Sequence, residues 1–364
     1  MASTLQQLNE LYADAKTCAK LVGLTYIDDD SRGITRRKQG KGFVYHDSDQ
    51  QLIADKVLKE RIAKLVIPPA WQEVWICPQT NGHILATGID DKGRKQYIYH
   101  PKWRTMRDLI KFYRMIVFAK ALPTIRKTID GDISRQDLGR NIVLGVMLWL
   151  LDNTYIRIGN ERYYEQNQSV GLTTLTTKNI VIAGPVITIA FKGKSGKDQQ
   201  ITFEDQRVAN ILNKLREQAG DRLFTYTDRT GQHILEAADM NQYLQEITGV
   251  AITAKDFRTW GGTLMAFHHL IETEKSSEET PKPEKVIVEA VDTAAAVLGN
   301  TRSVARSSYI HPHILNAYGT KHFTSYYQKA ARKRTASGLD KRETELLGFL
   351  EQLFEAEFDL LKRT

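Results

Sequence analysis

The stretch WRTMRDLIKFYRMIVFAKALPTIRKTI, Trp103 to Ile129, separates two parts of the sequence that differ in character. Its apolar residues recur every three or four positions, which predicts a long helix. Short β-type runs precede it, and mostly helical patterns follow it. We therefore expect an α+β protein with a small N-terminal β-sheet domain, residues 1–103, and a larger mainly helical domain, residues 104–364.

Short runs rich in β-branched and aromatic residues predict the strands of the first domain. They are GFVYH, EVWIC, HILATG and KQYIYH, with turn signals at Asn81-Gly82 and at residues 90–93. The segment between the first two, residues 49–65, has a helical pattern. The basic segment SRGITRRKQGKG, residues 31–42, is interpreted as a loop. A small antiparallel sheet with one or two helices follows from these patterns.

One β-type segment interrupts the helical domain. PVITIAFKGKSGKDQQITF, residues 185–203, predicts a β-hairpin with a basic tip. A polar connector at residues 274–285 precedes a helix that should end at Gly299, and Thr301 should cap a short helix that carries Tyr309 and stops at Pro312. The last predicted helix, residues 340–362, is amphipathic, and the sequence leaves open whether it packs within the chain or recruits another molecule.

The charge balance indicates a polyanionic partner. The 51 Lys and Arg residues exceed the 43 Asp and Glu residues, which gives a formal net charge of +8. This excess favours nucleic acid first and an anionic membrane surface second. The longest apolar run, Ile142–Leu151, is too short to span a bilayer. Cys18 and Cys77 form no disulfide or zinc pattern, which fits a reducing cytoplasm.

Cleavage of a phosphodiester by a tyrosine requires a defined set of side chains. A phenol must attack phosphorus in line, cations must hold the non-bridging oxygens, and a proton must reach the departing oxygen. Residues of these types stand in separate, well-marked segments: Arg157, Lys194, Arg258, Asn300 and Tyr309. Each alone is equally compatible with a plain structural role, such as an ion pair, a solvated turn or a half-buried helix position.

Together these segments resemble the type IB DNA topoisomerases of the compact bacterial and poxvirus kind. The matching motifs are IRIGNERY, SVGLTTL, the Gly-Lys hairpin tip, KDFRTWG, the Gly-Asn-Thr that precedes the tyrosine, and GRKQYIYHPKW. The resemblance covers residues 30–320 in outline and implies a tyrosine recombinase-like catalytic domain. It also implies relaxation of supercoiled duplex DNA without ATP, without a cofactor and without an obligatory metal.

The resemblance also implies a role for each candidate. Tyr309 matches the nucleophile that forms a 3′-phosphotyrosyl link, Arg157 and Arg258 match the phosphate-binding arginines, and Lys194 matches the general acid. Asn300 departs from the pattern, because many family members have a histidine there. An amide can donate a hydrogen bond to a phosphate oxygen, but it cannot change charge near neutral pH.

Further residues are candidates for DNA contact, because basic runs usually lie on phosphates and the resemblance marks the neighbouring motifs. They are Arg32, Arg36, Arg37, Lys38 and Lys41 in the basic segment; Arg94, Lys95, Gln96, Tyr97 and Tyr99 in GRKQYIYH; Asn160, Arg162 and Tyr163 after the first arginine; and Lys192 and Lys197 beside the hairpin tip. Gln96 should lie opposite the two tyrosines on a strand, and one of the tyrosines should pack in the core.

No metal site is expected, because three consecutive acids at residues 28–30 should not converge as ligands do. The expected partner is double-stranded DNA, bound by a monomer that is cytoplasmic, nucleoid-associated and independent of membranes. Two alternatives stay open on the sequence. One is a tyrosine site-specific recombinase, which shares the Arg–Lys–Arg–Tyr set, and the other is a DNA-binding protein without catalysis.

Overall fold

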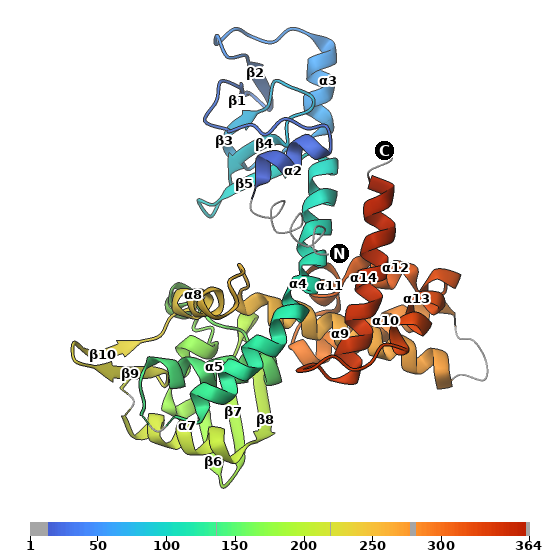
Figure 1. The fold of residues 1–364 in the computed structure, drawn as a ribbon. Helices are drawn as coiled ribbons and strands as arrows, with labels where there is room; N and C mark the ends of the chain where they lie inside the picture. Colours follow the sequence, from blue (N-terminus) through green and yellow to red (C-terminus); the bar gives the residue numbers. More distant parts are fainter. Residues whose placement is uncertain (1–13, 136, 219, 277–281, 362–364) are drawn as a thin grey trace. The chain divides into compact units, whose positions relative to one another are not determined.

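The structure, a computed structural model, describes residues 14–135, 137–218, 220–276 and 282–361, apart from the side chains of residues 163, 195, 276 and 358–361 (Figure 1). The chain forms two compact units, Met1–Arg114 and Met115–Thr364. The division falls inside helix α4, Pro101–Ile133, and is C-terminal to the predicted boundary at residue 103. An antiparallel sheet in the first unit and a mainly helical second unit confirm the predicted α+β class.

The first unit is built on a five-stranded antiparallel sheet in the order β2-β1-β3-β4-β5. Its strands are β1 (Ile34–Gln39), β2 (Gly42–His46), β3 (Gln72–Ile76), β4 (Ile84–Ile89) and β5 (Lys95–Tyr99). Helices α2 (Ala15–Leu21) and α3 (Lys56–Lys64) each begin at an aspartate whose carboxylate accepts backbone N–H groups of the first turn. Because Asp55 caps α3, this helix is shorter than the predicted one.

The basic segment at residues 31–42 is not a loop, and that prediction is wrong. Residues 34–39 form β1, which pairs with β2 from Thr35↔His46 to Gln39↔Gly42 around a turn at Gly40 with φ of 58°. Only Ile34 of this strand is buried, and the strand reaches β3 only at Ile34 and Thr35. The rest of β1 therefore lies in a two-stranded ribbon with little apolar contact, so its sequence lacks the usual strand pattern.

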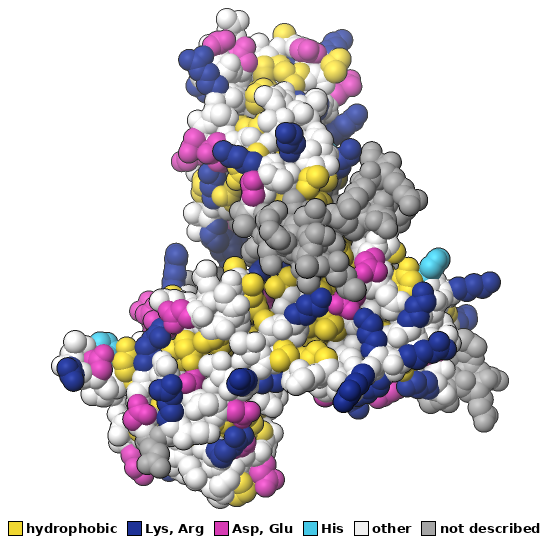
Figure 2. Space-filling view, viewed as in Figure 1, with side chains coloured by type: hydrophobic (Ala, Val, Ile, Leu, Met, Phe, Trp, Pro, Cys, Tyr) yellow, Lys and Arg dark blue, Asp and Glu magenta, His cyan; other side chains and the backbone are white. Residues whose placement is uncertain are grey.

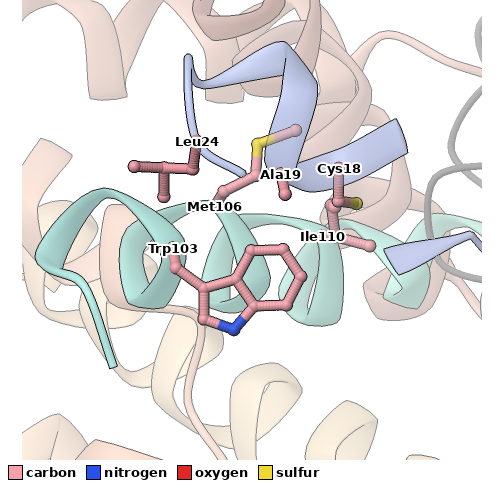
Figure 3. Close-up of a cluster of buried hydrophobic side chains, with 6 residues drawn as sticks. All are labelled: Cys18, Ala19, Leu24, Trp103, Met106 and Ile110. Atoms are coloured by element: carbon pink, nitrogen blue, oxygen red, sulfur yellow. The ribbon is translucent and has the colours of Figure 1, made fainter. Parts of the chain in front are cut away.

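The beginning of α4 packs in the core of the first unit. Its residues Trp103, Met106 and Ile110 form a buried cluster with Cys18, Ala19 and Leu24 (Figure 3). A second cluster fills the space between the sheet and α3 and contains Ile34, Ile53, Ile62, Val74, Ile76 and Ala86. The first turns of α4 thus belong to the N-terminal core, which places the division at residue 114.

The second unit combines helices with two small sheets. Besides the rest of α4, its helices are α5 (Arg140–Thr154), α6 (Glu161–Asn167), α7 (Gln206–Gln218), α8 (Ala237–Thr248), α9 (Ala254–Ser276), α10 (Pro283–Leu298), α11 (Arg302–Ser308), α12 (Pro312–Ala317), α13 (Lys321–Ala331) and α14 (Lys341–Leu361). The strands are β6 (Ile180–Ala183), β7 (Val186–Lys192), β8 (Asp198–Glu204), β9 (Thr225–Asp228) and β10 (Gly231–Ile234). The predicted hairpin is β7–β8, in register from Val186↔Glu204 to Lys192↔Asp198.

The C-terminal helix packs within the chain, which answers the question that the sequence left open. Leu346, Phe349 and Leu350 of α14 are buried, and the helix contacts α13 and α9, beside which it runs in Figure 1. The predicted connector at 274–285 is described only in part, because residues 277–281 lie outside the described residues. No helix of the described chain is long and apolar enough to cross a membrane.

Candidate active site

Tyr309 lies at the C-terminal end of α11. Helix α10 ends at Gly299, whose φ of 59° suits glycine, and the Thr301 side chain accepts the Val304 N–H and so caps α11. The end of α10 and the start of α11 confirm the sequence prediction. The predicted stop at Pro312 is wrong, because α11 ends at Ser308 and Pro312, which suits the first position of a helix, begins α12. Tyr309 itself ends α11 and is half-buried, so it is neither a core tyrosine nor a fully solvated one.

Helix α9 holds the backbone of the Tyr309 segment. The Thr263 hydroxyl donates to the Tyr309 carbonyl oxygen at 3.1 Å and accepts the His311 N–H at 3.1 Å. A methyl group on Gly262 would lie 2.9 Å from the same carbonyl oxygen, so only glycine allows this close approach. The sequence prediction missed both Gly262 and Thr263, although they directly follow the KDFRTWG motif.

Arg258 joins two helix ends to the tyrosine ring. Its Nη1 donates to the Tyr155 carbonyl at the end of α5, and its Nη2 donates to the Leu298 carbonyl at the end of α10 at 2.8 Å. Its Cζ lies 5.0 Å from the centroid of the Tyr309 ring. Only 4% of Arg258 is exposed. Burial, together with the nearby Arg157 charge, lowers the pKa of Arg258 to about 10.

Arg157 and Asn300 meet directly, although 143 positions separate them in the sequence: Arg157 Nη2 donates to Asn300 Oδ1. The arginine is held by a backbone pairing in which Leu172 N–H donates to Arg157 O and Thr173 N–H donates to Ile158 O, both at 2.8 Å. This pairing joins IRIGNERY to SVGLTTL, which explains why the two motifs occur together.

A glycine in each motif permits that pairing. Gly159 has φ of 88°. A methyl group on Gly171 would lie 2.5 Å from the Gly159 Cα, so the two chains touch through their backbones at this point. A side chain at Gly171 would displace the segment that carries Arg157.

Arg157, Arg258, Asn300 and Tyr309 form the group of residues that is called the pocket from here on. Two buried donors of this group have no hydrogen-bond partner within the described part of the chain: Asn300 Nδ2 and Arg258 Nε. A buried N–H group without a partner costs about 1–3 kcal/mol, so such groups are rare unless a ligand supplies the acceptor. One donor is neutral and the other is cationic. Oxygen atoms of an anion, such as a phosphate, match both of them.

The surroundings of Tyr309 favour its ionised form. Burial raises the pKa of the phenol, but the positive charges of Arg258, Arg157 and Lys255 outweigh burial, and the pKa lies below the usual tyrosine value. A phenol that loses its proton more readily is a better nucleophile. The pocket therefore has the electrostatics that tyrosine attack on phosphorus needs.

Lys194 stands at the tip of the β7–β8 hairpin, in a short 3₁₀ turn at Lys194–Gly196, and is exposed. Gln199 of β8 links this tip to the pocket. A methyl group on Gly193 would lie 3.0 Å from Gln199 Cγ, and one on Gly299 would lie 2.2 Å from Gln199 Oε1. The structure thus brings Arg157, Arg258, Asn300 and Tyr309 together and places the lysine on the adjoining hairpin.

The candidate DNA contacts on β1 and the turn after it fall into two groups. Arg36 uses its guanidinium inside the unit, where it donates to the carbonyls of Ile67, Pro68 and Trp71 and lies over the Phe43 ring. The other four side chains are exposed: Arg32, Arg37, Lys38 and Lys41. Of these, Arg32 pairs with Asp49 and Arg37 donates to Gln50.

Strand β5 presents two different faces, as the alternation predicts. Tyr97 and Tyr99 stack with centroids 5.6 Å apart, and it is Tyr99 that packs against buried clusters, whereas Tyr97 is 40% exposed. On the other face Gln96 donates to Asp90 at 2.9 Å. Arg94 also pairs with Asp90, and Lys95 pairs with Asp29.

The remaining basic candidates border the pocket segments of the second unit. Asn160, Arg162, Lys192 and Lys197 are exposed, and the side chain of Tyr163 lies outside the described residues. Lys and Arg side chains are spread over both units on the face that Figure 2 shows. This distribution matches the net positive charge of the chain.

The acids at residues 28–30 do converge, contrary to the prediction: ligand atoms of Asp28, Asp29 and Asp30 lie within 4.8 Å of one another. Asp29 is already paired with Lys95 at 2.7 Å. The carboxylates lie close because the chain turns there, and Ser31 N–H closes the turn on the Asp28 carbonyl. We assign no metal to this turn.

Comparison with known proteins places the chain in a family. Residues 100–336 match the model of the eukaryotic DNA topoisomerase I catalytic core, and residues 42–90 match that of the bacterial DNA topoisomerase IB N-terminal domain. The first match contains all five candidate residues of the pocket and the hairpin.

Curated relatives agree with these matches. DNA topoisomerase 1B of Acanthamoeba polyphaga mimivirus is 36% identical over 295 residues, which cover 79% of this chain and 87% of the relative. DNA topoisomerase I of Monkeypox virus is 25% identical over 297 residues, covering 80% of this chain and 92% of the relative. The chain therefore belongs to the type IB DNA topoisomerases.

Proposed function

We propose that this topoisomerase relaxes supercoiled duplex DNA by cutting one strand with Tyr309, allowing rotation and rejoining the strand. The observation that carries the proposal is the pocket around this tyrosine. Arg258 lies near the Tyr309 ring, the Arg157 charge helps to lower the pKa of its phenol, and Asn300 accepts a hydrogen bond from Arg157. Two buried donors there have no partner among the described residues. A scissile phosphate would supply the missing acceptors.

In the cleavage step, Tyr309 gives up its phenol proton to water, and its oxygen attacks phosphorus as the bond from phosphorus to the 5′-oxygen breaks. The phosphate stays on the 3′-oxygen and becomes linked to the tyrosine. Charge develops on the non-bridging oxygens, where Arg157, Arg258 and the Asn300 amide donate hydrogen bonds. The Lys194 ammonium gives a proton to the departing 5′-oxygen, because an alkoxide is a poor leaving group.

The rejoining step is the reverse reaction. The free 5′-hydroxyl returns its proton to Lys194, attacks phosphorus and displaces Tyr309. The phosphotyrosine ester has roughly the free energy of the bond it replaced, so the cycle does not require ATP. While the ester exists, the cut strand can rotate about its partner, which relaxes supercoils of either sign.

The exposed basic residues contribute affinity for the duplex backbone. Lys38 and Lys41 near the β1–β2 turn, and Lys192 and Lys197 beside the hairpin tip, carry charges suited to phosphates. Tyr97 is the candidate for contact with a base edge, since it is the more exposed tyrosine of β5. We propose that the enzyme acts as a monomer on the DNA of the nucleoid.

Relaxation of supercoiled plasmid, in EDTA and without ATP, tests the proposal. The wild type should relax the plasmid completely, whereas Tyr309→Phe should bind the same plasmid and leave it supercoiled. Relaxation by Tyr309→Phe would contradict the assignment of the nucleophile. A wild type that binds without relaxing would indicate a DNA-binding protein, and activity only on paired sites would indicate a recombinase.

A further inference from the structure

The C-terminal helix α14 contributes Glu343 to a partly buried ion-pair network close to the elements that hold Arg258. Arg126 of α4 donates to both carboxylate oxygens of Glu343, at 2.7 and 2.8 Å, and to both oxygens of Asp152, at 2.8 and 3.1 Å. Glu343 is 4% exposed. Its Oε1 also accepts the Trp260 indole N–H at 3.3 Å. Four helices, α4, α5, α9 and α14, therefore meet at this carboxylate and its partner arginine.

Two members of the network lie close in sequence either to Arg258 or to a residue that binds Arg258. Trp260 follows Arg258 by two positions on α9 and is 2% exposed. Asp152 precedes Tyr155 on α5, and the Tyr155 carbonyl accepts from Arg258. The Tyr155 ring lies against Gly261, where a methyl group would be 2.4 Å away. Glu343 thus fixes the two elements between which the Arg258 guanidinium is held.

The charges of the network are strongly perturbed, in keeping with its burial. Burial raises the pKa of the Tyr155 phenol, and the Asp152 and Glu343 carboxylates raise it further. Burial by itself would raise the pKa of Glu343, but its bonds to Arg126 and to the Asp340 N–H lower it below the usual value. A carboxylate that stays ionised keeps Arg126 paired.

The same helix also contacts the segment that follows Tyr309. Glu357, near the C-terminal end of α14, pairs with His313 Nδ1. His313 stands four positions after Tyr309 and belongs to α12. Because α14 comprises residues 341–361, it lies beyond the matched catalytic core, which ends at residue 336.

We propose that α14 is a positioning element of the active site, and that Glu343 orients Arg258 for the transition state through Trp260 and through Arg126–Asp152. The inference depends on the proposed function, because it concerns the same cleavage step. Loss of the carboxylate should shift α9 against the end of α5 and misplace the guanidinium. A misplacement on the order of 1 Å can slow a reaction by about 100-fold.

Glu343→Gln in the full chain tests the inference, because glutamine keeps the shape but loses the charge. Glu351→Gln is the matched control. Glu351 lies on the same helix, and within the described part of the chain its ion pairs with Lys120 and Lys333 do not lead to Arg258. The measurements are thermal midpoint, duplex affinity at fixed salt, and the rate at which excess enzyme forms a denaturant-trapped adduct with supercoiled plasmid.

Glu343→Gln should slow adduct formation by about 10-fold to 100-fold, with duplex affinity within about 2-fold of the wild type. Glu351→Gln should form the adduct at the wild-type rate, even if its thermal midpoint falls as far as that of Glu343→Gln. Equal rates in the two glutamine variants would overturn the inference. If the wild type forms no adduct, the proposed function fails instead, so the two failures are distinguishable.

Trp260→Phe provides a second test, since it removes the indole donor while an aromatic ring stays at this buried position. The double variant Trp260→Phe with Glu343→Gln should form the adduct no more slowly than the slower single variant, because both substitutions act on the same contact between Trp260 and Glu343. Independent, multiplying losses would mean that Glu343 does not act through Trp260. If Glu343→Gln does not fold, Trp260→Phe alone tests the inference. A wild-type rate of adduct formation in Trp260→Phe would then contradict it.

Discussion

Asn300→Asp is the substitution that tests the buried amide donor of Asn300 most directly. The Asn300 Oδ1 already accepts from Arg157, and aspartate would keep that bond as an ion pair. What changes is Nδ2, the buried donor without a partner among the described residues, which becomes an oxygen. Volume and shape are preserved, so the fold and the pairing with Arg157 should persist.

The expected loss follows from the count of donors. One donor to the developing oxyanion is removed, which typically costs about 10²–10³-fold in rate, or about 2.7–4 kcal/mol. The new negative charge repels the phosphate and adds to this loss. The assay is denaturant-trapped adduct formation with excess enzyme over supercoiled plasmid, together with duplex affinity and the thermal midpoint.

Asn300→His serves as the positive control, because imidazole also offers a donor, and it should stay active. Asn300→Asp should reduce the rate of adduct formation by at least about 100-fold with an unchanged thermal midpoint. An aspartate variant that cleaves at the wild-type rate would refute the reasoning, since the pocket would then not need the amide donor. Complete loss in the histidine variant would also count against it.

Further predictions concern the nucleophile, its support and the general acid. Gly262→Ala places a methyl group 2.9 Å from the Tyr309 carbonyl oxygen, so the segment must shift; cleavage should slow by about 10-fold to 100-fold while duplex affinity is kept, and an unaffected rate would show that the close approach is unimportant. Lys194→Ala should cleave ordinary DNA slowly and regain speed on a duplex with a 5′-bridging phosphorothiolate, whose leaving group needs no proton; equal defects on both substrates would argue against the acid role. Lys255→Met should raise the pKa of Tyr309, because one of the charges that lower it is lost; the tyrosinate signal, measured by ultraviolet titration against Tyr309→Phe, should move to higher pH, and no movement would exclude the lysine as a contributor.

Local sequence signals predicted the elements that bear the site. Gly299 and Thr301 mark a helix end and a helix start by the chemistry of capping, and both boundaries are confirmed. The β7–β8 hairpin was equally predictable, since β-branched alternation flanks its glycines. Strand β1 was missed because its side chains, apart from Ile34, contribute little to the core. Its sequence is therefore basic and lacks the apolar alternation that predicts a strand.

Contacts between distant segments could not be predicted from the sequence. Thr263 holds the Tyr309 backbone across 46 positions, and the Arg126–Glu343 pair spans 217 positions. Neither pairing leaves a periodic or spaced pattern, because tertiary packing alone decides it. The resemblance to the family supplied the candidate reacting groups, whereas the residues that contact and support them were found in the structure.

The central claim is that the Tyr309 phenol oxygen forms the bond to DNA. The most direct measurement is to trap the wild-type enzyme on plasmid with denaturant, digest protein and DNA, and identify the linked peptide by mass spectrometry. We expect one modified peptide that contains Tyr309, with the nucleotide attached through its 3′-phosphate. A nucleotide on any other residue, or attachment through a 5′-phosphate, would contradict it.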